Sequence, residues 1–158
     1  MNKIHSTLGN QDILKLPKTA FFCSRNCPPD LLLKTYDWAI EQERQNECII
    51  SGFHSPIEQD ILDLLVKNPK QNIIIVPARG KYKTLPKKLK LLINSNRFLL
   101  LFYFPETIKS QNLQTCIERN QKIVDLSNKI VFSHISTNGI LKETFDYAKR
   151  IKKEIMLL

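Results

Sequence analysis

Short apolar runs alternate with longer amphipathic stretches along the whole chain. Most of the short runs are continuously hydrophobic, as expected of strands that are covered on both faces of a sheet. They predict strands at Thr19–Cys23, Cys48–Ser51, Asn72–Val76, Phe98–Tyr103, Lys129–His134 and Glu154–Leu158.

The stretches between these runs have the three- and four-residue spacing of helices with one buried face. They predict helices at Asp30–Gln45, Ser55–Val66, Leu85–Ile93, Asn112–Leu126 and Gly139–Ile151. In the first helix the apolar stripe includes Leu33 and Ile40. The second has a strong start, with Ser55 as the cap, Pro56 as the first helical residue and Glu58 reaching back to the cap.

Strands that are joined by helix-length crossovers form a parallel sheet. The order of elements therefore predicts an α/β fold, a doubly wound, mostly parallel, six-stranded Rossmann-like sheet with helices on both faces. Residues 1–17 are expected to form a lead-in with a short helix near Gln11–Leu16, and residues 18–158 a single domain.

Charge is concentrated in one part of the chain. The 158 residues include 24 Lys or Arg and 15 Asp or Glu, a formal net charge of +9. No acidic residue lies between Asp63 and Glu106, where the basic residues are Lys67, Lys70, Arg79, Lys81, Lys83, Lys87, Lys88, Lys90 and Arg97. Such a segment indicates either a nucleic-acid surface or simply a solvated face.

The composition excludes other classes. The longest uncharged run, Phe98 to Pro105, is too short to cross a bilayer, so a cytoplasmic protein without a membrane contact is expected. Cys23, Cys27, Cys48 and Cys116 lack the spacing of a zinc site, and neither GxGxxG nor a P-loop pattern is present. No metal or cofactor is therefore predicted.

A ligand of an open α/β sheet binds outside the carboxyl ends of the strands. The loops expected there contain Ser51-Gly52, Arg79-Gly80-Lys81 with Lys83, and Ser136-Thr137-Asn138-Gly139. Helices opening at Ser55 and Gly139 would direct free N–H groups at a phosphate, and Arg25, Arg79 and Arg119 are candidate cationic partners.

Each of these assignments has an alternative. Gly52 and Gly139 could instead supply positive φ angles, Arg119 could be a helix-surface residue, and the lysines could be a solvated face. Catalysis has little support, because a Ser51–His54–Glu58 arrangement lacks the G-x-S-x-G elbow. No catalytic residue is predicted.

Four motifs together resemble one family. They are Cys23-Ser24-Arg25, the run CIIS ending at Ser51 and followed by Gly52, the run ERNQKIVDLS from Glu118 to Ser127, and the turn Ser136-Thr137-Asn138-Gly139. In order, they are similar to the G-S/T-R turn, the S-G turn, the R-N-R-x-I-A-x-L-S element and the later S-G turn of the bacterial DNA-processing protein DprA (Smf) family.

The resemblance implies a Rossmann-like domain of the wider group that includes LOG-type proteins. It also implies a homodimer that binds single-stranded DNA and hands it to a RecA-type recombinase. The residues that match the motifs are Ser24, Arg25, Ser51, Gly52, Arg119, Asn120 and Gly139.

The sequence also departs from the family pattern. Cys23 replaces a glycine and Gln121 replaces the second arginine of R-N-R. The P-G-G-x-G-T-x-x-E motif of LOG enzymes is absent, although Gly139 and Glu143 echo its end. The chain is therefore expected to be a diverged, stand-alone relative.

Three functions remain open. The first is binding of single-stranded DNA or a nucleotide phosphate, in DNA processing, uptake or recombination. The second is sensing of a nucleotide derivative, or LOG-like hydrolysis of a nucleoside monophosphate. The third is an interaction module without a ligand.

Overall fold

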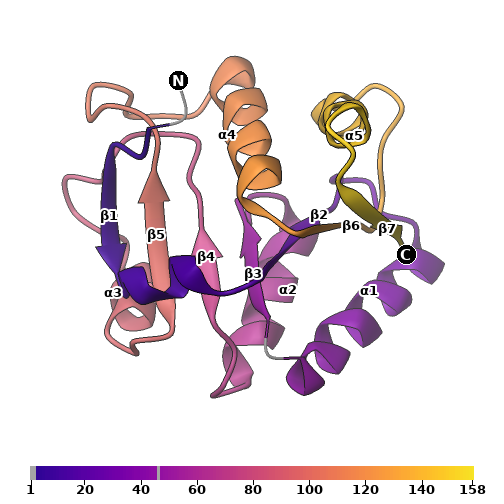
Figure 1. The fold of residues 1–158 in the computed structure, drawn as a ribbon, viewed down its shortest axis with the longest axis horizontal. Coiled ribbons are helices and arrows are strands. Elements are labelled where there is room, and N and C mark those ends of the chain that lie inside the picture. The colour runs from indigo at the N-terminus through magenta and orange to yellow at the C-terminus, as the bar shows by residue number, and fades with distance from the viewer. Residues whose placement is uncertain (1–2, 46) are drawn as a thin grey trace.

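The chain forms a mixed sheet with helices packed on both of its faces (Figure 1). The computed structural model describes residues 3–45 and 47–158. Within them the strands are β1 (Ser6–Gly9), β2 (Lys18–Phe22), β3 (Cys48–Ser51), β4 (Ile73–Ile75), β5 (Phe98–Phe102), β6 (Lys129–Phe132) and β7 (Glu154–Leu157). The α-helices are α1 (Pro29–Glu41), α2 (Pro56–Lys67), α3 (Lys87–Ile93), α4 (Leu113–Leu126) and α5 (Ile140–Arg150), and the 3-10 helices are η1 (Gln11–Lys15) and η2 (Gln42–Arg44).

The α/β fold and all six predicted strands are confirmed, but the predicted strand number is wrong, because the sheet has seven strands over the described residues. The additional strand, β1, lies in the predicted lead-in and pairs antiparallel with β5, with Ser6 opposite Phe102. The reason is that β1 has a single large apolar residue, Leu8. It therefore lacks the hydrophobic run that marks a strand buried on both faces.

The strand order is β1-β5-β4-β3-β2-β6-β7. From β2 the chain moves outward through β3, β4 and β5, then returns to β6 on the other side of β2 and continues to β7. Every pair except β1 with β5 is parallel. The direction of winding therefore reverses between β2 and β6, and the carboxyl ends of these two strands part there.

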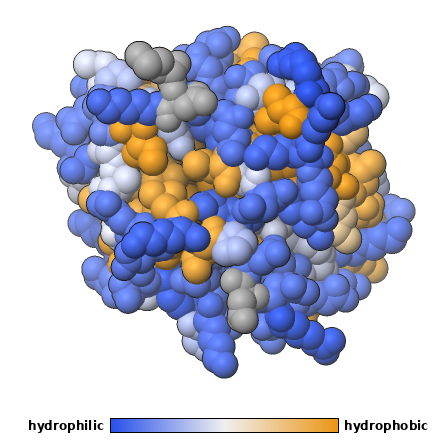
Figure 2. Space-filling model, in the orientation of Figure 1, coloured by the Kyte–Doolittle hydropathy of each residue, from blue (hydrophilic) through white to orange (hydrophobic). Residues whose placement is uncertain are grey.

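Two hydrophobic cores lie on opposite faces of the sheet. Helices α1, α2 and α3 pack into one core through Trp38, Ile61 and Leu92, among others. Helices α4 and α5 pack into the other, for example through Ile123 and Ala148. Figure 2 shows the α4 side, where an apolar area is visible beside α4, over β5 and β4, on the part of this face that α4 and α5 do not cover.

Neighbouring aromatic residues of β2 point into opposite cores, because successive side chains of a strand alternate between the two faces of the sheet. Phe21 stacks on Trp38 of α1 with ring centroids 4.9 Å apart. Phe22 points to the opposite face and stacks on Phe132 of β6 at 5.4 Å. Each fully buried Phe side chain contributes about 1.5–3 kcal/mol by leaving water.

The predicted apolar face of α1 is partly wrong. Leu33 is 67% exposed and Ile40 is 56% exposed, whereas Trp38 and Ala39 are buried. Apolar residues stand next to each other at several positions of this helix, so the sequence is compatible with two different apolar faces. The stacking of Trp38 on Phe21, which the local pattern does not contain, selects the one that faces the sheet.

The predicted start of α2 is confirmed. The Ser55 hydroxyl accepts the Glu58 N–H at 3.2 Å, and the Glu58 carboxylate accepts the Ser55 N–H at 3.1 Å. Asn112 and Thr115 form the same reciprocal box at α4. Both helices therefore start with their first N–H groups satisfied by their own side chains.

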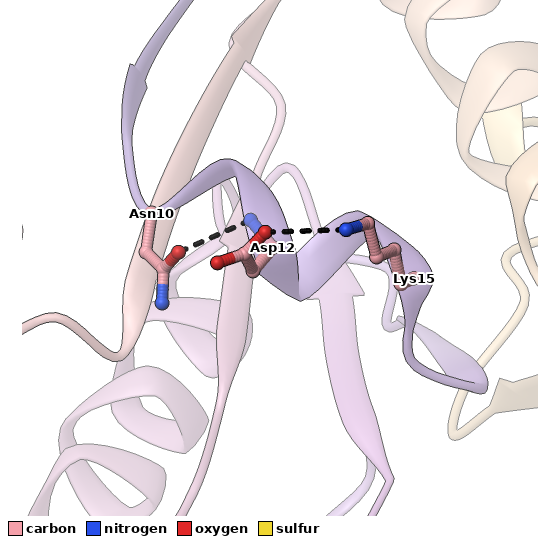
Figure 3. Close-up of polar contacts among 3 residues, drawn as sticks. All are labelled: Asn10, Asp12 and Lys15. Carbon is pink, nitrogen blue, oxygen red and sulfur yellow. Dashed lines mark hydrogen bonds and ion pairs between the residues drawn. The ribbon is translucent and has the colours of Figure 1, made fainter.

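Helix η1 joins the lead-in to the sheet (Figure 3). The Asn10 side chain accepts the Asp12 N–H at 3.1 Å, and Lys15 pairs with Asp12 at 3.5 Å. The amide nitrogen of Asn10 also donates to the Asn96 carbonyl at 2.9 Å, so this turn is held to the loop before β5.

Part of the basic segment has a structural explanation. The Arg97 guanidinium donates to the carbonyls of Asn68 and Gln71, at 2.7 and 3.1 Å, next to the end of α2. Lys88 forms an ion pair with Asp63 at 2.6 Å. These two cations stabilise the fold and need no ligand.

We expect Arg97→Ala to lower the free energy of unfolding by about 1.5–3 kcal/mol, because it leaves part-buried carbonyls without their charged donor. Lys90→Ala, which removes the same charge from an exposed position of α3, is the matched control and should change stability by less than about 0.5 kcal/mol. Urea denaturation of both variants checks this. Equal effects would contradict the capping role of Arg97.

Candidate functional site

A cleft of about 410 Å³ opens where the ends of β2 and β6 part. Its walls are the loops after β2 and β6, the start of α2, one side of α4 and the start of α5. It is lined by seven of the residues predicted to bind a ligand, namely Ser24, Arg25, Arg119, Asn120, Ser136, Asn138 and Gly139. The sheet topology therefore brings together residues that are far apart in the sequence.

Ser24 joins the two loops that flank the cleft. Its N–H donates to the His134 carbonyl at 2.8 Å, and its hydroxyl accepts the Ser136 N–H at 3.0 Å. The following residue, Arg25, is exposed. Ser24 thus fixes the loop on which Arg25 extends into the cleft.

Arg119 forms the floor of the cleft and is not a helix-surface residue, since it is only 5% exposed. Its Nη1 donates to the Val76 carbonyl at 3.1 Å and its Nε to the Asn120 side chain at 2.7 Å. Asn120 in turn donates to Thr144 of α5 at 3.1 Å. Burial lowers the pKa of Arg119, and the Glu58 charge opposes that shift.

Glu58 is buried next to Arg119 and holds the neighbouring turns together. Its carboxylate accepts the N–H groups of Cys23, His54 and Ser55, at 3.1, 2.9 and 3.1 Å. Burial raises the pKa of Glu58, whereas these N–H groups and the Arg119 charge lower it. The sequence predicts only the helix cap, because the link to β2 depends on how α2 packs against the sheet.

His54 lies at the mouth of the cleft between two donors. The Arg25 Nη2 is 3.2 Å from its Nε2, and the amide of Gln111 contacts both ring nitrogens. Burial lowers the pKa of His54, and the charges of Arg119 and Arg25 lower it further, so the ring is neutral at pH 7. Gln111 carries no sequence signal and is placed there only by the loop before α4.

The three residues considered for nucleophilic catalysis are engaged elsewhere. Ser51 is fully buried and its hydroxyl accepts the Phe53 N–H at 3.1 Å. The Glu58 carboxylate bonds to backbone N–H groups rather than to the imidazole of His54. This geometry holds a turn in place and does not activate a hydroxyl.

Two loop glycines, Gly52 and Gly80, are required for a reason other than a positive φ angle. Among glycines in the described residues, only Gly9 has one, so the φ alternative is wrong for Gly52 and Gly139. A Cβ at Gly52 would collide with the Arg119 guanidinium, and one at Gly80 with the Pro105 carbonyl. Gly52 is therefore set by the buried arginine.

Only one of the two expected helix starts presents free N–H groups. That of α2 is closed by its own capping box. At α5 the cap is Gly139, and no side chain of the described residues caps the helix. Ile140 and Leu141 of this first turn line the cleft, so the positive end of the α5 dipole faces it.

Two further hollows continue the cleft along the same edge of the sheet. The first, of about 240 Å³, shares His54 and Arg119 with the cleft and is also lined by Gly52. The next, of about 490 Å³, shares Arg79 and Tyr82 with it. The predicted residues Lys81 and Lys83 line this last hollow together with Lys109.

The remaining predicted residues lie outside this row. Thr137 lines a separate hollow on the far side of Gly139, of about 540 Å³. Gly80 is buried and donates its N–H to the Ile108 carbonyl at 2.8 Å. Ser51 and Gly80 therefore contribute to the structure of the loops and do not line the cleft.

No group of three or more His, Cys, Asp or Glu among residues 3–45 and 47–158 is arranged to hold a metal ion. In the same part of the chain, no helix has the length and apolarity to span a membrane.

We expect Gly52→Ala to destabilise the protein by about 2–3 kcal/mol, because the new Cβ would displace a buried guanidinium from its partners. Gly139→Ala, whose Cβ would meet Ser136 at an ordinary contact distance of 3.4 Å, should cost less than about 1 kcal/mol. Thermal unfolding of both variants tests this difference. A tolerated alanine at Gly52 would contradict the packing of Arg119 on this turn.

No protein-family model matches the sequence, and no curated protein sequence matches it significantly. Solved structures do resemble it. DNA processing protein A (DprA) from Streptococcus pneumoniae is 22% identical with a TM-score of 0.79, over 96% of this chain and 53% of that one. The chain thus spans about half the length of that protein.

Two other structures extend the comparison. DNA processing protein A from Helicobacter pylori, described for its single-stranded DNA binding mode, is 17% identical with a TM-score of 0.78, over 96% of this chain and 69% of that one. The molybdenum cofactor binding protein from Rippkaea orientalis is 10% identical with a TM-score of 0.63, over 90% of this chain and 76% of that one. The chain therefore has the Rossmann-like fold of DprA, as the resemblance of its loops predicts.

Proposed function

We propose that the chain binds single-stranded DNA, with a phosphate held in the cleft at the ends of β2 and β6. The observation that carries this proposal is the convergence of Arg25, the buried Arg119 and the open start of α5 on one cleft. An anion there meets two positive side chains and a helix dipole of the favourable sign.

The charges of the cleft favour an anion over a cation. Its acidic lining residue, Glu58, accepts three backbone N–H groups and faces Arg119, so its charge is compensated. Arg119 is buried, where screening by water is weak. Arg25 is exposed, so its side chain can reach a phosphate oxygen. The planar guanidinium group matches the geometry of a phosphate.

The row of hollows suits a chain of nucleotides rather than one. It leads from Gly139 past His54 to Arg79, whose guanidinium lies 4.0 Å over the Tyr82 ring. A stacked cation of this kind offers a flat surface to a base. Phe104, in the loop after β5, is buried and offers no such surface.

The fold shared with two DprA proteins supports this assignment. We extend the proposal to what the family resemblance implies, a cytoplasmic homodimer that acts in DNA processing and delivers the strand to a RecA-type recombinase. Size-exclusion chromatography with light scattering tests the dimer independently of DNA.

A single nucleotide is the second candidate ligand, and the volume of the cleft favours it, since about 410 Å³ lies within the range of small-molecule pockets. Hydrolysis has less support. Glu143, which echoes the glutamate of the LOG motif, lines the hollow beyond Gly139 and not the cleft. We therefore propose binding without catalysis.

We expect the affinity for oligo-dT to fall with salt by about 0.7 log units per log unit for each phosphate that is neutralised. Arg25→Ala should weaken binding about tenfold and reduce this slope by about 0.7. Lys70→Ala removes the same charge at the opposite edge of the sheet, before β4, and should bind like the wild type. Fluorescence anisotropy at two salt concentrations measures all three proteins.

Binding that is absent at low salt, or lost equally in both variants, would contradict the proposal. A thermal-shift screen with nucleoside monophosphates separates the second candidate. A rise in melting temperature with a mononucleotide, without oligo-dT binding, would favour the nucleotide pocket.

Binding should also depend on pH through His54. Its pKa in the free protein lies below the usual 6.5, and a bound phosphate next to the ring would raise it. The complex then takes up a proton, so affinity should rise as the pH falls from about 8 and level off below the free-state pKa. His54→Gln should remove this rise, whereas His5→Gln, at an exposed position before β1, should retain it. If the rise persists in His54→Gln, another group is responsible for the pH dependence.

A further inference from the structure

Two cysteines flank the loop that carries Arg25 into the cleft. Cys23 directly follows β2, and Cys27 lies two residues before α1, with Ser24, Arg25 and Asn26 between them. Both thiols are free. The Cys27 Sγ lies 3.8 Å from the Ser133 hydroxyl, and the Cys23 thiol interacts with that hydroxyl and with the Cys27 thiol. Both thiols therefore lie next to the Ser133 hydroxyl and to each other.

The two thiols differ in their access to solvent. Cys23 is 1% exposed, whereas Cys27 is partly exposed. Burial is also the main cause that raises the pKa of Cys23 to about 12. An oxidant in solution therefore reaches Cys27 first, and Cys23 can react only with a neighbour.

We propose that Cys23 and Cys27 are a peroxide-sensitive pair whose disulfide displaces Arg25 and weakens binding in the cleft. Formation of the disulfide concerns the thiols alone, whereas its effect on binding rests on the proposed function.

The chemistry balances with a hydroperoxide as the oxidant. The Cys27 sulfur attacks the O–O bond of hydrogen peroxide, which gives a sulfenic acid at Cys27 and one water. The Cys23 sulfur then attacks the Cys27 sulfur, the S–O bond breaks, and the hydroxyl leaves as a second water with the Cys23 proton. Two thiols are oxidised to one disulfide, and one peroxide is reduced to two waters.

A disulfide between Cys23 and Cys27 would change the conformation of the loop, because the two ends of the loop must move closer together. Sulfur atoms in a disulfide are about 2.05 Å apart, closer than any contact between two thiols. Drawing Cys27 toward Cys23 breaks its contact with Ser133. It also brings the two ends of the three-residue segment between the cysteines closer together. Arg25, whose Nη2 lies 3.2 Å from His54, is the residue that this shift removes from the cleft.

The first experiment is peptide mapping of the intact protein after treatment with hydrogen peroxide and blocking of remaining thiols. We expect a loss of about 2 Da in the peptide that contains both Cys23 and Cys27, reversed by dithiothreitol. Cys116→Ser, which removes another thiol that lines the cleft, should retain this change, whereas Cys27→Ser should abolish it. Oxidation of Cys27 to sulfinic acid without the linked peptide, or a disulfide to Cys116, would overturn the pair.

The second experiment compares oligo-dT binding of the reduced and the oxidised protein. We expect the oxidised wild type to bind about tenfold more weakly and the peroxide-treated Cys27→Ser variant to bind like the reduced protein. A disulfide that leaves binding unchanged would overturn the regulatory half. If the reduced protein binds no oligo-dT, the proposed function fails, while the mapping experiment still decides the pair.

Discussion

The site depends on one buried electrostatic arrangement, the carboxylate of Glu58 facing the guanidinium of Arg119 beneath the switch point of the sheet. Glu58 satisfies N–H groups of the chain leaving β2 and of the turn after β3, and Arg119 satisfies the carbonyl after β4. Removing Glu58 would take away the carboxylate charge that favours the protonated form of the buried Arg119 guanidinium. The buried Arg119 guanidinium also explains Gly52, because it occupies the space that a side chain there would need.

This arrangement also gives the cleft its sign. Glu58 is compensated by backbone dipoles as well as by Arg119, so the net field at the surface comes from the arginines and the start of α5. The two helix starts near the cleft have separate roles. The α2 start is closed by its own side chains and fixes the loop geometry, whereas the α5 start remains open to a ligand.

The basic segment, by contrast, is less uniform than its sequence suggests. Arg97 caps carbonyls near the end of α2 and Lys88 pairs with Asp63, so these two charges belong to the fold. Arg79 and its neighbouring lysines lie at the carboxyl edge of the sheet and continue the cleft. Net charge alone therefore overstates the surface available to a polyanion, and position relative to the strand ends decides which cations are relevant.

The sequence by itself determined the periodic elements, the parallel direction of six strands and the cap of α2, because these follow from the local pattern and from the alternation of strands and helices along the chain. Only the tertiary structure decided that β1 joins the sheet, that α1 turns Trp38 rather than Leu33 inward, and that Arg119 is buried. It also decided that Gln111 meets His54. These contacts join segments distant in sequence, and they depend on strand order and on how each helix packs, neither of which a local pattern of apolar and polar residues contains.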